Sequence, residues 1–253
     1  MISELARQLH AEPSGVITDI GEGDEMYRPD RHDVYFRQAL SALRCIRLAL
    51  LTAGKREVHS LLDFPCGHGR VLRMLKAEFP DAKLTAGDIN EDGVDFCERV
   101  FGAKPIYSAP RAKDVEIHDQ FDLIWCGSLL THLDLDRWEE FFNLLADSVA
   151  ERGLFVFTAF GNWAASRLRS GEYDYNLDED GVERILAAFD QDGFGYSDYP
   201  GQALSGMSLT SPEWLLAQLA AHPELRLVSF MPRGWGRHQD VLACVKQTSV
   251  TGR

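Results

Sequence analysis

The feature that most constrains the fold of this chain is the stretch 60–90, in which an apolar run, two glycines, a helical pattern and a second apolar run follow one another. The run at 61–64 is compact and is followed by turn signals at Gly67 and Gly69, a pattern typical of a buried parallel strand. Apolar side chains at helical spacing then predict a helix over 70–79, which the next residue, a proline, stops. The stretch therefore predicts a strand, a tight turn and a helix in direct succession.

Glycines at a strand-to-helix turn let the backbone approach a ligand closely, and the free amide groups of the helix point to the same place. A second strand is expected over 83–87, so that Asp88 ends it beside the same crevice, where a carboxylate can accept the hydroxyls of a ribose. A nucleoside-containing ligand is therefore the first hypothesis. The dinucleotide fingerprint needs a third glycine where this chain has Leu72, which leaves a nicotinamide-dependent oxidoreductase as the weaker alternative.

The residues at 63–69, Asp-Phe-Pro-Cys-Gly-His-Gly, resemble the first motif of class I S-adenosylmethionine-dependent methyltransferases, usually D-x-G-x-G-x-G. The chain departs from that motif at Pro65, which stands where most members have their first glycine. It is also similar to the family in Asp88, the acidic end of the second strand, and in 121–133, which resembles the fourth strand and the loop after it. Together these similarities span 60–133.

The resemblance implies an α/β fold with a Rossmann-like, seven-stranded, mostly parallel sheet in the order 3-2-1-4-5-7-6, helices on both faces and an antiparallel last strand. It also implies S-adenosylmethionine as the cofactor and S-adenosylhomocysteine as the product. The cofactor-binding residues that follow from it are Asp63, Pro65, Cys66, Gly67, His68, Gly69, Asp88, Ile89, Ser108, Cys126, Gly127 and Ser128.

Apolar patterns place the remaining elements of this sheet. They predict strands over 105–108, 121–125 and 154–160 and a closing pair over 225–231 and 240–246. Between the fourth and fifth strands, Asp136 with Glu139 three residues later has the spacing of a capping box and predicts the start of a helix that ends at Gly153.

The amino-acid composition limits which binding partners and which cellular compartment are expected. The 253 residues, 45% of them hydrophobic, suit one α/β domain with insertions. A formal net charge of −13 argues against nucleic acid, which is bound mainly by Lys and Arg at phosphates. The five cysteines lack paired metal-ligand spacing, so we expect reduced thiols and no metal. No apolar run could span a membrane and no signal-peptide pattern occurs, so we expect a cytoplasmic protein without a membrane partner.

The chain 1–253 is expected to be a single methyltransferase domain made of four parts. N-terminal cap or lid helices occupy 1–53, the cofactor-binding core 58–160, a substrate-side insertion 161–211, and the final helix with the closing hairpin 212–248. In the family, N-terminal helices often close over the cofactor, and the aromatic residues around 27–36 lie where such a lid would be. Ordinary packing on the sheet is the alternative for them.

Two histidines are candidates for a general base, because the unperturbed pKa of histidine lies near neutrality. His132 follows the turn after the fourth strand, where many members of the family also have a histidine. The alternative is that it hydrogen-bonds a loop backbone and holds the crevice in shape. His238 lies in the connection 232–239, which could reach the substrate or be an exposed hairpin tip.

The insertion 161–211 is the least family-like segment, so we expect it to select the acceptor. It is acidic and aromatic, and its acidic run is either a solvated surface or a means of attracting a cationic substrate. Aromatic residues there and elsewhere combine flat apolar faces with polar groups. The expected substrate-binding residues are Tyr35, Tyr196, Tyr199 and Trp235.

The sequence thus predicts a methyltransferase that moves the methyl group of S-adenosylmethionine to an oxygen, nitrogen or carbon of a small molecule. Holding the nucleophile, methyl and sulfur in line can supply roughly 7 to 11 kcal/mol, so a dedicated base is optional. The alternatives are a non-catalytic S-adenosylmethionine-binding module and the oxidoreductase named above. The acceptor and the oligomeric state do not follow from the sequence.

Overall fold

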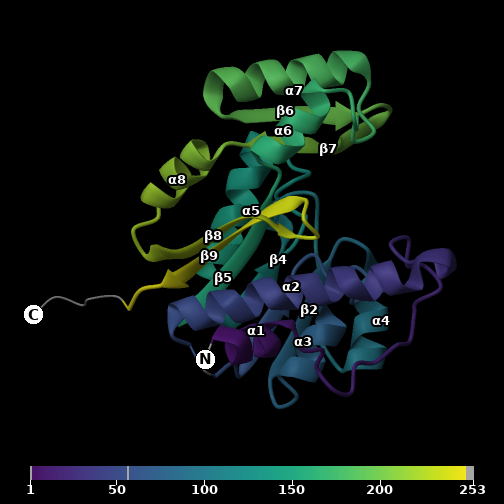
Figure 1. The fold of residues 1–253 in the computed structure, drawn as a ribbon, viewed down its shortest axis with the longest axis vertical. Helices are drawn as coiled ribbons and strands as arrows, with labels where there is room; N and C mark the ends of the chain where they lie inside the picture. Colours follow the sequence, from purple (N-terminus) through teal and green to yellow (C-terminus); the bar gives the residue numbers. More distant parts are fainter. Residues whose placement is uncertain (1, 56, 249–253) are drawn as a thin grey trace, which may run out of the picture.

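Seven strands form one sheet at the centre of the computed structural model, which describes residues 2–55 and 57–248 (Figure 1). Their order is β3-β2-β1-β4-β5-β9-β8; β1 to β5 pair in parallel, β9 runs antiparallel to β5, and β8 antiparallel to β9. The order and the antiparallel ending predicted from the resemblance are confirmed. The strands are β1 Ser60–Asp63, β2 Lys83–Asp88, β3 Lys104–Tyr107, β4 Phe121–Cys126, β5 Val149–Ala159, β8 Leu225–Trp235 and β9 Gln239–Lys246.

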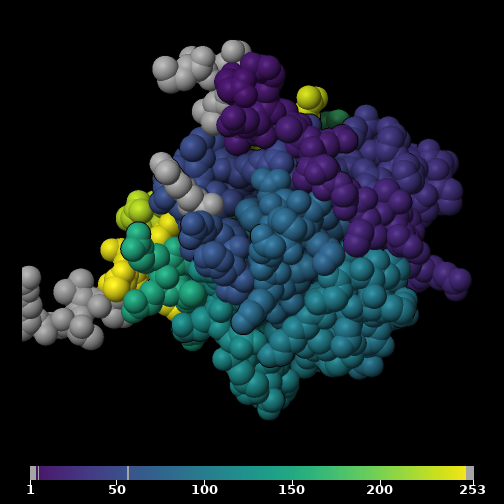
Figure 2. All heavy atoms as spheres, turned by 90° about the horizontal axis from the view of Figure 1, so that it is seen from below, coloured from purple at the N-terminus to yellow at the C-terminus, as the bar shows by residue number. Residues whose placement is uncertain are grey.

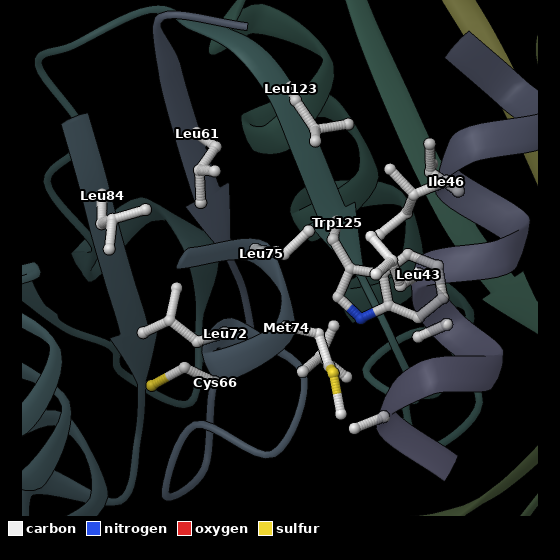
Figure 3. Close-up of a cluster of buried hydrophobic side chains, with 14 of the residues drawn as sticks. Leu43, Ile46, Leu61, Cys66, Leu72, Met74, Leu75, Leu84, Leu123 and Trp125 are labelled. Carbon is white, nitrogen blue, oxygen red and sulfur yellow. The ribbon is translucent and has the colours of Figure 1, made fainter. Parts of the chain in front are cut away.

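Helices cover both faces of this sheet, because side chains that alternate along each strand pack on opposite sides. On β4, Leu123 and Trp125 pack with α2, α3 and α4, whereas Ile124 and Cys126 pack with α5 and α8. Figure 3 shows Trp125 beside Leu43 of α2 in the first of these clusters. The helices are α1 Ile2–His10, α2 His32–Ala53, α3 Leu72–Glu78, α4 Glu91–Phe101, α5 Leu135–Asp147, α6 Asn162–Arg169, α7 Glu179–Asp192 and α8 Pro212–Ala220, with 3-10 turns η1 Pro29–Arg31 and η2 Ala112–Asp114.

The segment expected as an insertion folds around a small core of its own. Strands β6 (Phe194–Tyr199) and β7 (Gln202–Thr210) form a separate antiparallel sheet, which packs with α6 and α7. These elements lie together at the top of Figure 1, away from α1 to α4. The close packing depends on Gly195, where a Cβ atom would lie 2.1 Å from the carbonyl oxygen of Ile185. The sequence did not predict this second sheet.

The predicted start of α5 is wrong. The helix begins at Leu135, and its N-cap is Asp134, whose side chain accepts a hydrogen bond of 3.0 Å from the backbone amide of Arg137. Asp136 lies inside the first turn, so the expected capping box with Glu139 does not form. An acidic residue anywhere in the first turn complements the helix dipole, which is why the pattern at 136–139 suggested a start two residues too late.

Most strands of the large sheet lie within one residue of their predicted bounds, and β5 and β8 depart further. β5 already begins at Val149, directly after α5, so Gly153 lies inside the strand and does not end the helix. β8 continues to Trp235, because the register shifts between Met231 and Trp235 and lets the strand pass through residues expected to form a loop. β3 lies one residue earlier than expected.

The N-terminal segment packs against the glycine turn that follows β1. The Arg73 guanidinium, fully buried in α3, donates hydrogen bonds from Nη1 to the carbonyl oxygens of Ile17 (2.9 Å) and Asp19 (3.0 Å). The Tyr35 hydroxyl donates to Asp24 Oδ2 at 2.6 Å. Figure 2 shows this purple segment running along the blue part of the surface. Within the described ranges, no helix is long and apolar enough to cross a membrane.

Candidate active site

The turn between β1 and α3 is held by the carboxylate that ends β2. Asp88 accepts hydrogen bonds from the backbone amides of Gly67 (Oδ2, 2.7 Å) and Asn90 (Oδ1, 2.9 Å). Gly67 has a φ of +49°, and a Cβ atom there would meet nothing within 4 Å, so its backbone borders open space. A carboxylate has about four lone-pair positions, so Asp88 can accept further hydroxyl groups from a ligand in that space.

Gly69 serves a different purpose from Gly67. Its φ is +72°, and a Cβ atom would lie 2.3 Å from the ring of Phe101, so only glycine lets α4 pack this closely on the turn. The ring of His68 lies between Gly21 of the N-terminal segment and α4, with Nε2 2.8 Å from Asp92 Oδ2. These two motif residues therefore support the shape of the turn.

Asp63, at the end of β1, is a buried acid without a partner. Its side chain is 1% exposed, and neither carboxylate oxygen has a hydrogen-bond partner among the described residues. Burial, and to a lesser extent the neighbouring Asp88, raises the pKa of the Asp63 carboxyl well above its usual range. Because Asp63 borders a cavity of about 260 Å³, a cationic ligand group there would supply the missing partner.

This 260 Å³ cavity, called the cofactor cavity below, lies at the carboxyl ends of β1, β2 and β4, where ligands bind in open α/β sheets. Besides Asp63 it is lined by Pro65, Cys66, Gly67, His68, Arg70, Asp88, Trp125, Gly127, Ser128, His132 and Trp235, and from the N-terminal segment by Asp24, Glu25 and Met26.

A second cavity of about 350 Å³ shares Pro65, Asp88 and His132 with the cofactor cavity. Its lining is mainly apolar, which suits the flat face of a nucleobase. The apolar lining residues are Phe64, Ile89, Ala109, Pro110, Leu129, Leu133, Phe141, Ala203 and Leu204, and Ser108 lines it as well. Ser108 and Ile89, both expected to bind the cofactor, thus line the same apolar cavity.

A third cavity of about 500 Å³ lies between α2, α6 and the tip of the β8–β9 hairpin, and we call it the arginine cavity. It shares Arg70, Ser128 and Trp235 with the cofactor cavity. Ser128 has a left-handed φ of +68°; its amide donates to Thr158 Oγ1 and its hydroxyl oxygen accepts from Gln239 Nε2, both at 2.8 Å. A non-glycine residue held in this conformation is a feature of functional sites.

His132 is oriented so that one ring nitrogen is free to act as a base. Its Nδ1 lies 2.9 Å from the carbonyl oxygen of Gly206, and since a carbonyl only accepts, Nδ1 carries the proton. Nε2 is then the unprotonated nitrogen of the neutral ring. Burial lowers the pKa of His132, which keeps the ring neutral near pH 7. Both alternatives from the sequence thus have support: His132 bonds a backbone carbonyl and also lines the cofactor cavity.

The other expected catalytic residue, His238, lines the arginine cavity. Its ring stacks on Tyr175 with a centroid distance of 5.3 Å, and burial together with Arg167 and Arg233 lowers its pKa. His132 and His238 share none of the three cavities.

The expected substrate-binding residues are only partly brought together. Trp235 lines both the cofactor and the arginine cavities, and the Tyr199 hydroxyl lies 3.0 Å from His132 Nδ1. Tyr35 and Tyr196 line none of the three cavities; the Tyr196 hydroxyl donates to Asp198 Oδ1 at 2.7 Å. Among the expected cofactor residues, Gly69 and the fully buried Cys126 also line none of them.

No ligand role for Arg70 or Arg167 follows from the sequence pattern, which places Arg70 only at the start of the predicted helix 70–79. Arg233 and Arg237 belong to the connection 232–239, for which contact with the substrate and an exposed hairpin tip were both open. The available signal was that Arg70 directly follows the glycine turn, where its side chain must lie near any ligand of that turn.

Part of this chain is similar in sequence to known methyltransferases. Residues 62–155 match the family model described as a methyltransferase domain. A malonyl-[acyl-carrier protein] O-methyltransferase from Anoxybacillus flavithermus is 29% identical over 112 residues, which cover 43% of this chain and 42% of that protein. The match thus spans less than half of the curated relative.

Solved structures of low sequence identity share the fold. A sugar N-methyltransferase from Streptoalloteichus has a TM-score of 0.59 at 17% identity, covering 91% of this chain and 95% of its own. A 1,6-didemethyltoxoflavin-N1-methyltransferase from Burkholderia thailandensis, solved with bound S-adenosylhomocysteine, has a TM-score of 0.55 at 15% identity and covers 87% of this chain and 83% of its own. The domain match and the shared fold confirm the predicted resemblance to class I methyltransferases.

Proposed function

We propose that this protein is an S-adenosylmethionine-dependent enzyme that transfers a methyl group to a small-molecule acceptor, at an oxygen atom; the match of residues 62–155 to a methyltransferase domain supports this. The observation that carries the proposal is the buried, unpartnered carboxylate of Asp63 beside the cofactor cavity. A buried charge without a partner costs stability, and it is retained where a ligand completes it.

The residues around the cofactor cavity fit S-adenosylmethionine group by group. Asp63 suits the ammonium of its methionine part, and Asp88 suits the ribose hydroxyls. Arg70 suits the carboxylate, because its guanidinium lies over the rings of Tyr35 and Trp235 and makes no hydrogen bond to any described residue. The apolar 350 Å³ cavity suits the adenine.

Oxygen as the acceptor atom is supported by His132. When bound, S-adenosylmethionine supplies a methyl group on a positively charged sulfur. A hydroxyl acceptor must lose a proton as it attacks, and the unprotonated Nε2 of His132, on the lining of the cofactor cavity, can take that proton. The curated relative is an O-methyltransferase as well.

We further propose that α6, α7, β6 and β7 select the acceptor, since they bring Arg167 to the arginine cavity and Gly206 to His132. The division of the chain into four parts and the cytoplasmic location stay predictions.

Calorimetric titration with S-adenosylmethionine, S-adenosylhomocysteine and NADH tests the cofactor, and release of S-adenosylhomocysteine with a panel of hydroxy and carboxy compounds tests the transfer. The panel includes a malonyl thioester, because the relative named above acts on one. We expect micromolar binding of both adenosyl compounds and none of NADH. Binding without release for any acceptor would support a non-catalytic module, and preference for NADH would overturn the proposal.

A further inference from the structure

The arginine cavity is lined by an unusual set of side chains for so acidic a protein. The chain has 39 Asp and Glu against 26 Lys and Arg. Yet four arginines line this cavity, and none of its lining residues in the described ranges is Asp or Glu. The lining residues are Val34, Gln38, Arg70, Ser128, Trp163, Arg167, Arg233, Trp235, Gly236, Arg237, His238 and Gln239.

The acidic residues of the segment 172–192 are exposed to solvent and do not line the arginine cavity. All of the following are exposed: Glu172, Asp174, Asp178, Glu179, Asp180, Glu183, Asp190 and Asp192. Only Glu172 reaches a cavity arginine, with an ion pair of 3.3 Å to Arg167 Nη2. The acidic run therefore forms a solvated surface, whereas Arg167 of the same region lines the arginine cavity.

Two of the arginines are held in place but keep hydrogen-bonding capacity. The guanidinium of Arg233 lies 3.8 Å from the ring centre of Trp163, and its Nε donates to the carbonyl oxygen of Arg237 at 3.1 Å. Its two terminal nitrogens have no partner among the described residues. Arg167 lies over the ring of Tyr173, and its buried Nε has no hydrogen-bond partner. A planar guanidinium fixed by an aromatic ring is well suited to bind a carboxylate or phosphate in a bidentate manner.

The electrostatic effect of this cluster appears at His238, whose pKa is lowered by burial and by the charges of Arg167 and Arg233. Arg237 has no ion-pair partner in the described part of the chain. Arg233 and Arg237 are exposed, so solvent weakens their attraction for an anion. An oxyanion in the cavity would still meet several cations at once, two of which, Arg167 and Arg233, are held against aromatic rings.

The cavity also continues into the cofactor cavity, since Arg70, Ser128 and Trp235 line both. A ligand with an anionic end at Arg233 can therefore extend past Ser128 toward the place where the methyl group is transferred.

We propose that the methyl acceptor carries an oxyanion group, a carboxylate or a phosphate, which binds to Arg167, Arg233 and Arg237, while its nucleophilic oxygen lies in the cofactor cavity. The proposal rests on the function proposed above and names the substrate class. In the transfer, the acceptor oxygen forms a bond to the methyl carbon, and the carbon–sulfur bond breaks with its electron pair remaining on sulfur. S-adenosylhomocysteine leaves as a neutral thioether, and the hydroxyl proton of the acceptor passes to His132 Nε2.

Tryptophan fluorescence provides a test that is independent of turnover, because Trp163 and Trp235 line the cavity. The protein, saturated with S-adenosylhomocysteine, is titrated with sodium malonate, inorganic phosphate and neutral malonamide at constant ionic strength. We expect saturable changes with malonate, phosphate or both, and none with malonamide. The stronger of the two anions distinguishes a carboxylate from a phosphate acceptor.

Arg233→Gln and Arg237→Gln should each weaken anion binding about ten- to a hundredfold, the cost of losing one hydrogen-bonded charged partner. Arg226→Gln on the exposed part of β8 is the matched control for the hairpin, and Arg169→Gln on α6 controls for Arg167→Gln. The controls should bind as the unmodified protein does.

Equal responses to malonate and malonamide, or anion binding that the three cavity variants leave unchanged, would overturn the proposal. Failure to bind S-adenosylhomocysteine would instead overturn the proposed function. In that case the same anion titration without S-adenosylhomocysteine still decides whether the arginine cavity binds oxyanions.

Discussion

His132, in the loop after β4, is hydrogen-bonded to Gly206 of β7 through a distance of 2.9 Å between its Nδ1 and the main-chain carbonyl oxygen. The two residues are 74 positions apart, so the small second sheet fixes the orientation of a ring that lines the cofactor cavity. The segment proposed to select the acceptor thereby also sets which nitrogen of the candidate base is free. Acceptor choice and proton transfer are therefore coupled through the backbone of β7.

The first prediction is that His132→Gln lowers kcat with a hydroxyl acceptor by about 10² to 10⁴, the usual contribution of a general base. S-adenosylhomocysteine affinity should change little. Since the base must be neutral and burial lowers its pKa, the rate should rise with pH below about 6.5 and then level off. His59→Gln, at an exposed position, is the control. Normal turnover in His132→Gln would show that His132 is not the base and serves only to bond the main-chain carbonyl of Gly206.

The second prediction concerns Asp88. Asp88→Ala should weaken S-adenosylmethionine binding about 10- to 100-fold in calorimetric titration, because hydrogen bonds to a charged group contribute roughly 1.5 to 3 kcal/mol. It should also lower the melting temperature by a few degrees, since the amides of Gly67 and Asn90 lose their acceptor. The affinity of Asp88→Asn should lie between those of the unmodified protein and of Asp88→Ala. Asp95→Ala, on the exposed side of α4, is the control and should bind S-adenosylmethionine normally. Unchanged affinity in Asp88→Ala would contradict the ribose assignment.

The third prediction separates stability from binding at Asp63. The pKa of its carboxyl is raised in the folded protein, so the folded state holds this proton more tightly than the unfolded state does. The protonated Asp63 carboxyl therefore contributes to the free energy of unfolding at low pH. This contribution is lost as the pH rises from about 4 through the raised pKa. Asp63→Asn should flatten that decline and raise the melting temperature of the ligand-free protein at pH 7.5, while it weakens cofactor binding. A lower melting temperature would show that the carboxylate is structural.

The fourth prediction is that deleting residues 1–32 destabilises the protein and weakens cofactor binding. The deletion removes the carbonyl groups of Ile17 and Asp19 and leaves Arg73 buried without these partners, a loss of roughly 3 to 5 kcal/mol. Thermal denaturation measures this, and Arg73→Met in the truncated chain should recover part of the loss because an apolar side chain fits the buried site. If the truncated chain binds S-adenosylhomocysteine as tightly as the full chain, the lid hypothesis fails.

The sequence by itself determined the cofactor half of this protein. The bounds of β1, β2, α4 and the turn between β1 and α3 follow from apolar runs, glycines with positive φ and helix caps, all of which act within a few residues. Asp88 was found in the same way, because a strand end and a glycine turn close in sequence must lie close in space. The N-cap of α4 is not Asp88 but Asn90, whose side chain accepts from the amide of Gly93.

Only the tertiary structure decided the acceptor half. Arg70, Arg167 and Arg233 belong to three separate elements, and no local pattern indicates that their side chains meet in one cavity. The same holds for the separate sheet of β6 and β7, whose residues looked like an acidic, aromatic loop. Local periodicity reports which side of an element is buried, but contacts between distant segments depend on how whole elements pack. For this reason the acidic run of 161–211 suggested at most a cationic substrate, whereas the packed chain surrounds a cavity suited to an anion.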